Sequence, residues 1–133
     1  MYEATIEKTF SAAHALRLPD GSLEPLHGHD WLVKATVASE GLDAMDTVMD
    51  FHDLEQLVES RIGPWRNQNL NAVAPFSGGA GGEDHAHGLA INPSAERVAE
   101  QIAWTVSGGL PEHVWLKEIS VGEAPGCVAR YRP

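Results

Sequence analysis

Three histidines on two extended segments constrain the fold of this chain more than any other feature. His27 and His29 lie two residues apart, and on a strand such residues point to the same face. His14 lies on an upstream segment, and pairing the two segments as a long antiparallel hairpin brings it beside the other two. Three imidazole nitrogens leave a tetrahedral zinc ion one open position, which is typical of a catalytic site. We therefore interpret the three as zinc ligands rather than as ordinary histidines, although iron or nickel also suits such a site.

The composition bounds the class of protein. The chain has 133 residues, 43% of them hydrophobic, which suits one globular domain over residues 1–133. It lacks the long apolar run of a membrane span and the N-terminal pattern of a signal peptide, so we expect a cytoplasmic protein. The formal net charge of −10 argues against binding to nucleic acid or to an anionic membrane. The only cysteine, Cys127, excludes an intrachain disulfide, and we expect it to be a small buried residue rather than a nucleophile.

The hydrophobic pattern also predicts the order of the elements. We expect a first helix that begins at Asp50 or Asp53 and ends at Gly63, and a second that has Pro93 in its first turn and ends at Gly108. Alternating stretches predict four strands, over residues 2–12, 31–39, 114–121 and 128–131.

This order, β-β-α-α-β-β, predicts an α+β domain with a four-stranded antiparallel sheet and two helices on one face. A glycine-rich stretch at about residues 75–91 indicates a surface loop inserted before the second helix. The sheet would have two open edges, and unpaired edges favour association with other strands. We therefore expect self-association into a larger barrel.

Several short strings occur in the order seen in one enzyme family. They resemble the 6-pyruvoyl-tetrahydropterin synthases, a family that includes the 6-carboxytetrahydropterin synthases, and the resemblance spans nearly the whole chain. The strings are Phe10-Ser-Ala-Ala-His14, Leu26-His-Gly-His29, Val48-Met-Asp-Phe51, Leu70-Asn71, Asn92-Pro-Ser-Ala-Glu96 and Lys117-Glu118.

The resemblance implies a tunnel fold, in which three subunits join their sheets into a barrel and two trimers stack as a hexamer. It also implies a pterin substrate and zinc held by the three histidines. Glu118 is the matching pterin anchor, since a carboxylate accepts two N–H bonds from the edge of the ring. Ser94, in its matched string, is assigned to substrate binding.

The chain departs from the family pattern at its acid–base residues. The position of the usual catalytic cysteine, four residues before the first histidine of the His-Gly-His string, is Leu23. An Asp-His pair that precedes the Leu-Asn string in the family is matched here by Arg66 and Asn67, and neither is a convincing proton shuttle.

Glu24 is a candidate to replace the missing cysteine. It stands three residues before His27, and the spelling Glu-x-Leu-His-Gly-His is similar to a subgroup in which glutamate replaces the cysteine. That subgroup cleaves the side chain of dihydroneopterin to give 6-hydroxymethyl-dihydropterin. We expect Glu24 to transfer the proton that begins the cleavage, with a loop carboxylate facing water as the plain alternative.

A second acid–base candidate lies in the insertion. Asp84 and His85 could replace the missing shuttle, although loop histidines commonly have no function. A second metal at His85 and His87 is not expected, because no third ligand lies near them in the sequence. We interpret His52 and His113 as structural or exposed.

Three functions remain open at this point. The first is a zinc-dependent lyase that acts on a dihydroneopterin-type pterin. The second is a 6-pyruvoyl- or 6-carboxytetrahydropterin synthase with a non-standard base from the insertion. The third is a pterin- or purine-binding homologue that kept the metal and lost the original reaction.

Overall fold

A computed structural model describes residues 1–77, 83–84 and 89–133. Its main feature is a long antiparallel hairpin of β1 (Tyr2–His14) and β2 (His27–Ser39). β6 (Trp115–Ala124) pairs with β2, and β7 (Cys127–Tyr131) pairs with β6, both antiparallel. The predicted strands and their order are confirmed, and the hairpin strands run on to include the three histidines.

The sheet contains one strand that the pattern did not predict. β3 (Gln68–Asn69) pairs in parallel with Ala12 and Ala13 of β1, so the sheet has five strands in the order β3-β1-β2-β6-β7. The expectation of four antiparallel strands is therefore wrong at one edge. Two residues are too few for a period of two to show, and Asn67 before them has a φ of 58°, a turn conformation that asparagine tolerates.

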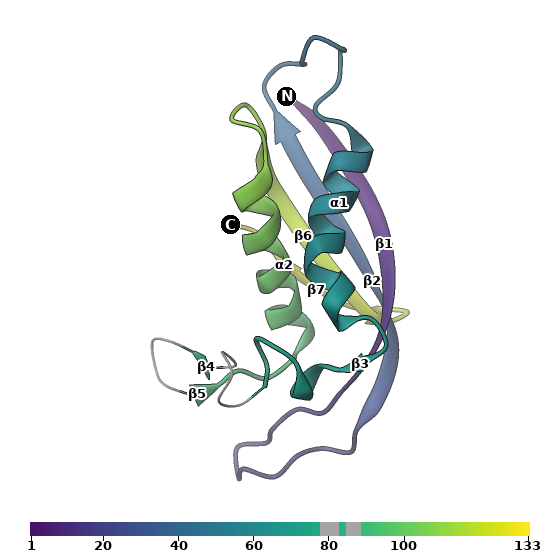
Figure 1. The fold of residues 1–133 in the computed structure, drawn as a ribbon, viewed down its shortest axis with the longest axis vertical. Helices are drawn as coiled ribbons and strands as arrows, with labels where there is room; N and C mark the ends of the chain where they lie inside the picture. Colours follow the sequence, from purple (N-terminus) through teal and green to yellow (C-terminus); the bar gives the residue numbers. More distant parts are fainter. Residues whose placement is uncertain (78–82, 85–88) are drawn as a thin grey trace.

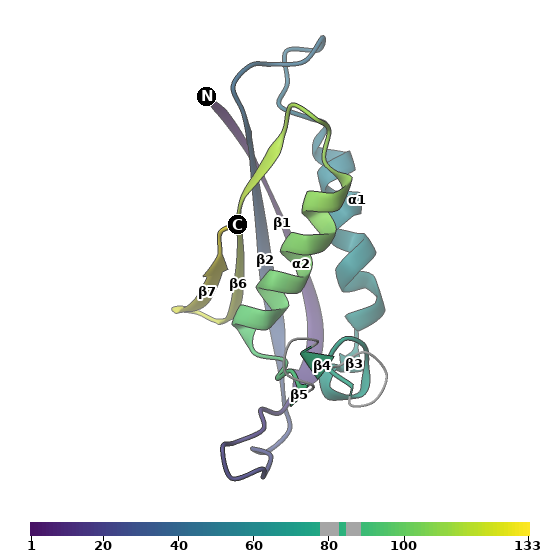
Figure 2. The same ribbon diagram turned by 90° about the vertical axis from the view of Figure 1, so that its left-hand side faces the viewer.

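Two helices cover one face of the sheet (Figures 1 and 2). α1 (Phe51–Ile62) begins after Asp50, whose carboxylate accepts the His52 N–H at 2.7 Å, and ends at Gly63. α2 (Ala95–Gly109) begins after Ser94, whose hydroxyl accepts the Arg97 N–H. The predicted helices are confirmed, but Pro93 precedes the cap rather than lying in the first turn.

Aromatic side chains form the centre of the core beneath these helices. Phe10 stacks on Trp31 across the hairpin with ring centroids 5.8 Å apart, and Trp65 packs against Phe10 at 6.1 Å. Burial of rings of this size contributes much of the stabilising free energy of a domain. Trp65 belongs to a short turn, η1 (Gly63–Trp65), that follows α1. The aromatic core therefore ends four residues from His14 and His27, measured along the two strands of the hairpin.

The segment between the helices is only partly described. It contains η2 (Leu70–Ala72) and a short antiparallel pair, β4 (Glu83–Asp84) with β5 (Leu89–Ala90). His85 and His87, named above, lie outside the described residues. Within the described part of the chain, neither helix is long and apolar enough to cross a membrane.

The surface differs from expectation at the single cysteine. Cys127 is exposed, so the prediction that it is buried is wrong. It is the first residue after the two-residue turn that joins β6 to β7, and a hairpin end has no layer above it to cover a side chain. His52 and His113 are exposed, in agreement with the alternative given for them.

Replacement of Asp50 by alanine should lower the free energy of unfolding by about 1 kcal/mol, because the first turn of α1 loses the acceptor of its His52 N–H. Urea denaturation followed by circular dichroism measures this. Asp53→Ala is the matched control, since Asp53 lies in the same turn without being the cap. Equal losses from the two variants would contradict a specific role for the cap.

Candidate metal centre and substrate pocket

The pairing of β1 with β2 assembles the three predicted ligands. His14 lies directly opposite His27, and Ala12 lies opposite His29. Because side chains alternate between faces along a strand, all three histidines share the face that carries Phe10 and Trp31. The sequence therefore places the histidines at the end of the core-facing side of the hairpin, where the helices no longer cover it.

The distances between the imidazoles fit a small metal ion. One ring nitrogen from each of His14, His27 and His29 lies within 4.8 Å of the others. The Nε2 atoms of His14 and His29 are 3.1 Å apart. A tetrahedral zinc ion with Zn–N bonds of about 2.0–2.1 Å spaces its ligand nitrogens by roughly 3.3 Å. Little movement of the rings would be needed to hold such an ion.

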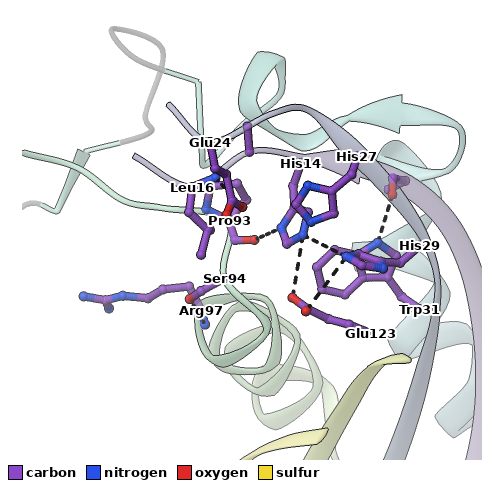
Figure 3. A network of polar contacts seen from close by, with 12 residues as sticks. His14, Leu16, Glu24, His27, His29, Trp31, Pro93, Ser94, Arg97 and Glu123 are labelled. Atoms are coloured by element: carbon purple, nitrogen blue, oxygen red, sulfur yellow. Dashed lines mark hydrogen bonds and ion pairs between the residues drawn. The ribbon is translucent and has the colours of Figure 1, made fainter. Parts of the chain in front are cut away.

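Backbone carbonyls orient two of the rings, and Figure 3 shows the one of Pro93, which faces His14. His14 Nδ1 lies 2.7 Å from the Pro93 carbonyl, and His27 Nδ1 lies 2.8 Å from the Pro25 carbonyl. A carbonyl oxygen only accepts, so each Nδ1 carries the proton and each Nε2 keeps its lone pair. This is the outer-shell arrangement found around histidine ligands of metals, and both Nε2 atoms are thereby prepared for an ion.

The centre is buried on one side and open on the other. His14 is 1% exposed and packs edge-on to Trp31, with ring centroids 4.8 Å apart. His27 is exposed and His29 is half-buried. Burial lowers the pKa of His29, and the nearby His14 and His27 lower it further, whereas Glu123 and Glu24 act in the opposite direction. A lowered pKa keeps the imidazole neutral, which is the form that binds metal.

Glu123 is a site residue that the sequence analysis missed. Its two carboxylate oxygens lie 3.7 Å from His14 Nε2 and 3.9 Å from His29 Nε2 (Figure 3). Strand alternation could have found it, because Ile119 and Val121 are core residues and Glu123 continues their face of β6. A carboxylate thus lies beside the ring nitrogens that would bind an ion.

Glu118, the anchor expected from the resemblance, lies elsewhere in the chain. It is five residues before Glu123 on β6, roughly 17 Å along the strand and on the opposite face. Its oxygens pair with Arg132 Nη2 at 2.5 Å and Arg130 Nε at 3.4 Å. The structure therefore does not bring Glu118 to the histidines of its own chain, and its anchor role stays a prediction.

Glu24 lies in the loop that joins β1 to β2. One carboxylate oxygen accepts the Leu16 N–H at 2.9 Å, and the Glu24 N–H donates to the Leu16 carbonyl at 3.0 Å. Figure 3 draws this pair on the His14 side of the cluster, and the Glu24 carboxylate is close enough to His29 to act on its pKa. Its second oxygen accepts no hydrogen bond from the residues that the structure describes. Glu24 is thus held close to the metal centre with one oxygen available.

The other predicted site residues are Ser94, Asp84 and His85, and the structure does not place them at the histidine cluster as ligands or bases. The Ser94 hydroxyl accepts the Arg97 N–H at 3.2 Å and so caps α2. Asp84 belongs to β4, and the structure does not describe its side chain. His85 lies outside the described residues, so the predicted Asp84–His85 shuttle stays untested.

The residues that replace the family's acid–base groups have other contacts. Leu23 is exposed. The Arg66 guanidinium pairs with both oxygens of Glu59, at 2.8 and 2.7 Å, and Lys8 lies 3.1 Å from the same carboxylate. Arg66 and Lys8 lower the pKa of Glu59 to about 2. Arg66 is therefore part of a surface ion-pair network that joins α1 to the turn after η1.

Two cavities are lined in part by Glu123. One of about 310 Å³ is lined in part by Ser94, Glu123 and Cys127. Another of about 560 Å³ is lined in part by Gly28, His29 and Glu123. Both volumes lie in the range of small-molecule sites, roughly 300–1,000 Å³. Glu123 lines both, but the second cavity is lined mainly by residues of the opposite face of the sheet, among them Leu32 and Gly122, so only a ligand in the first would lie on the histidine side.

Comparison with known proteins gives one family and one fold. The chain is similar to 6-pyruvoyl tetrahydropterin synthase from Caenorhabditis elegans (18% identity, 100% of this chain and 97% of that one, TM-score 0.73). It is similar to the Plasmodium falciparum synthase (20% identity, 99% and 97%, TM-score 0.75). A Plasmodium vivax synthase, solved as a variant with a catalytic glutamate replaced by alanine, aligns at 16% identity over 99% and 97% (TM-score 0.73). A search of curated sequences finds no significant match.

Sequence identity to these solved structures is low, so the likeness establishes the fold and not the activity. The sequence profile of the 6-pyruvoyl tetrahydropterin synthases matches residues 3–133, which includes all three histidines, Glu24 and Glu123. The domain is therefore an α+β tunnel fold, and the chain belongs to the 6-pyruvoyl tetrahydropterin synthase family.

Proposed function

We propose that this protein is a zinc-dependent lyase that cleaves or rearranges the side chain of a 7,8-dihydroneopterin-type substrate, with or without its triphosphate. The observation that carries the proposal is the cluster of His14, His27 and His29 with two carboxylates, Glu24 and Glu123, beside it. Membership of a pterin-processing family supports the class of substrate. The product that fits these residues best is 6-hydroxymethyl-dihydropterin.

The three imidazoles fit zinc by number and spacing, and His14 and His27 also by tautomer. Bound zinc would polarise the side-chain hydroxyl groups of the substrate and lower their pKa. His14 and His27 would direct Nε2 to the ion, because their Nδ1 protons go to backbone carbonyls. His29 would complete the set, and the open side of the centre, next to Glu123, would receive the substrate.

Glu24 would act as the base through its available oxygen. It would take the proton of a side-chain hydroxyl, the carbon–carbon bond next to that hydroxyl would break, and its electron pair would enter the ring imine. The carboxylic acid so formed would return the proton to the side-chain carbon that stays attached to the pterin ring. The rest of the side chain would leave as a small aldehyde. A positioned general base supplies about 10²–10⁴ in rate. The Plasmodium vivax relative, in which a glutamate is described as catalytic, supports a glutamate in this role.

Glu123 would hold the ring. Its two oxygens could accept two parallel N–H bonds from the amide and amino edge of a pterin, a charge-assisted pair that fixes orientation. Its place beside the ligand nitrogens supports this assignment. Glu118, the anchor that the resemblance implies, would serve a pocket on the opposite face of the sheet.

A synthase is the second candidate. The family profile and the solved relatives carry that name, and one of them is described with a catalytic glutamate, so the loss of the cysteine does not by itself exclude synthase chemistry.

We further propose that copies associate through the β3 and β7 edges, in a hexamer of the family type.

Removal of the metal should abolish turnover. Protein loaded with zinc should convert dihydroneopterin or its triphosphate, and protein stripped with a chelator should not, with activity restored by one equivalent of zinc per chain. Mass spectrometry of the products separates 6-hydroxymethyl-dihydropterin from a tetrahydropterin. A zinc-loaded protein that leaves both substrates unchanged would refute the lyase and the synthase together, and tight pterin binding in its place would identify a binding homologue.

Replacement of Glu24 by glutamine should lower kcat by about 10²–10⁴, because the amide cannot take the proton. Bound zinc should not change. Asp20→Asn is the matched control, since Asp20 lies in the same loop and its carboxylate also accepts a backbone N–H, that of Ser22. A kcat for Glu24→Gln close to that of the control would exclude Glu24 as the base.

A double variant, His85→Ala with His87→Ala, then distinguishes the two enzymes. A synthase that takes its base from the insertion loses activity in this variant. A lyase that uses Glu24 retains most of it.

Glutamine substitutions also distinguish the two anchor assignments. Glu123→Gln should raise KM by about 10- to 100-fold, since each hydrogen bond to a charged group contributes roughly 1.5–3 kcal/mol, while zinc stays bound. Glu118→Gln should raise KM much less if Glu123 is the anchor. The reverse order, measured by steady-state kinetics, would support the assignment from the family resemblance.

A further inference from the structure

We propose that Asn71 is a positioning residue of the metal centre, which holds the end of β1 in place and thereby fixes His14. This inference rests on the proposed metal role of the histidines. Asn71 itself touches no imidazole in the contacts that the structure describes. Its side-chain amide binds the backbone of Ala15, the residue directly after His14.

The Asn71 amide makes two hydrogen bonds with one residue. Its Oδ1 accepts the Ala15 N–H at 2.8 Å, and its Nδ2 donates to the Ala15 carbonyl at 2.7 Å. This is the pair of bonds that a neighbouring strand would supply to Ala15. Ala15 is 4% exposed, so without Asn71 its two polar groups would be shielded from water and unpaired, which costs about 1–3 kcal/mol for each group.

The register of the sheet explains why a side chain, rather than a strand backbone, binds the polar groups of Ala15. β3 pairs in parallel with β1 at Ala12–Gln68 and Ala13–Asn69, and two further steps of that register would bring Asn71 to Ala15. The chain has by then turned into η2, where the Asn71 N–H binds the Asn69 side chain instead. The Asn71 side chain thus continues the pairing where the backbone has left the sheet.

Only a side chain with both a donor and an acceptor on one planar group can do this. An amide meets that condition, whereas a carboxylate lacks the donor and would face the Ala15 carbonyl with a negative charge. Asn71 therefore holds Ala15, the first residue after β1, from the side on which the sheet has no further strand.

A second asparagine repeats the arrangement two residues later. Asn92 Oδ1 accepts the Arg17 N–H at 2.7 Å, and Asn92 Nδ2 donates to the Arg17 carbonyl at 3.1 Å. Glu24 binds Leu16 between them. Asn92 precedes Pro93, whose carbonyl orients the His14 ring. Side chains from two distant segments and from the same loop therefore hold residues 15–17, and Asn71 holds the residue that directly follows His14.

The test compares Asn71→Ala with Asn69→Ala. Asn69 caps η2 by accepting the Asn71 N–H at 3.0 Å, so its loss disturbs the same turn without removing a bond to Ala15. We expect Asn71→Ala to weaken zinc binding by about 10-fold, the low end of the effect of losing a direct partner of a ligand, because Asn71 acts on His14 only through the backbone, and Asn69→Ala to weaken it less than about 3-fold. Competition with a chromophoric chelator gives these dissociation constants, and the visible spectrum of the Co²⁺ form reports the ligand geometry.

Two further measurements distinguish positioning from general damage to the fold. Both variants should keep the wild-type far-UV circular dichroism at the assay temperature, although Asn71→Ala should melt lower, because it loses two hydrogen bonds to a buried residue and Asn69→Ala loses one. Hydrogen exchange at the Ala15 amide should accelerate in Asn71→Ala and not in Asn69→Ala. A wild type that binds zinc together with an Asn71→Ala variant that binds it equally tightly would overturn the role of Asn71 and leave the proposed function intact. A wild type that binds neither Zn²⁺ nor Co²⁺ would refute the proposed function, and the role of Asn71 with it.

Discussion

The pairing of His14 with His27 across the hairpin is the constraint on which the site depends. One register places Phe10 opposite Trp31, Ala12 opposite His29 and His14 opposite His27. A slip of one residue would turn one of the strands over and separate the rings onto two faces. The stacked Phe10 and Trp31 rings resist that slip, because it would expose one of them. The same packing that forms the core therefore sets the geometry of the histidine cluster four residues away.

Predictability from the sequence follows the strength of the local pattern. The hairpin and both helices have long periodic stretches with clear caps, and these were predicted, as was the histidine cluster. β3 was missed because two residues show no period, and its position depends on a turn at Asn67. The burial of Cys127 was predicted wrongly, because the apolar character of a residue does not show that it lies at the exposed end of a hairpin.

Glu123 shows a different limit of sequence analysis. It lies on a predicted strand, but its role depends on which face of β6 meets the histidines, and that depends on pairing between segments about 90 residues apart in the chain. A matched string drew attention to Glu118 instead, although strand alternation puts that residue on the other face. Asn71 was noted in a matched string without a role, because a side chain that substitutes for a strand leaves no periodic pattern.

The charges around the cluster also favour a divalent cation. Glu24 and Glu123 each bring one negative charge to a group of imidazoles, and burial lowers the pKa of His29 so that its ring is neutral. Neutral rings do not offset two carboxylates, and a carboxylate beside a partly buried surface is costly without a partner. A doubly charged ion held by the three rings would balance both. The three imidazoles with Glu24 and Glu123 therefore form a group of side chains that could hold a divalent ion, and Glu24 supplies a carboxylate where the usual family cysteine is absent.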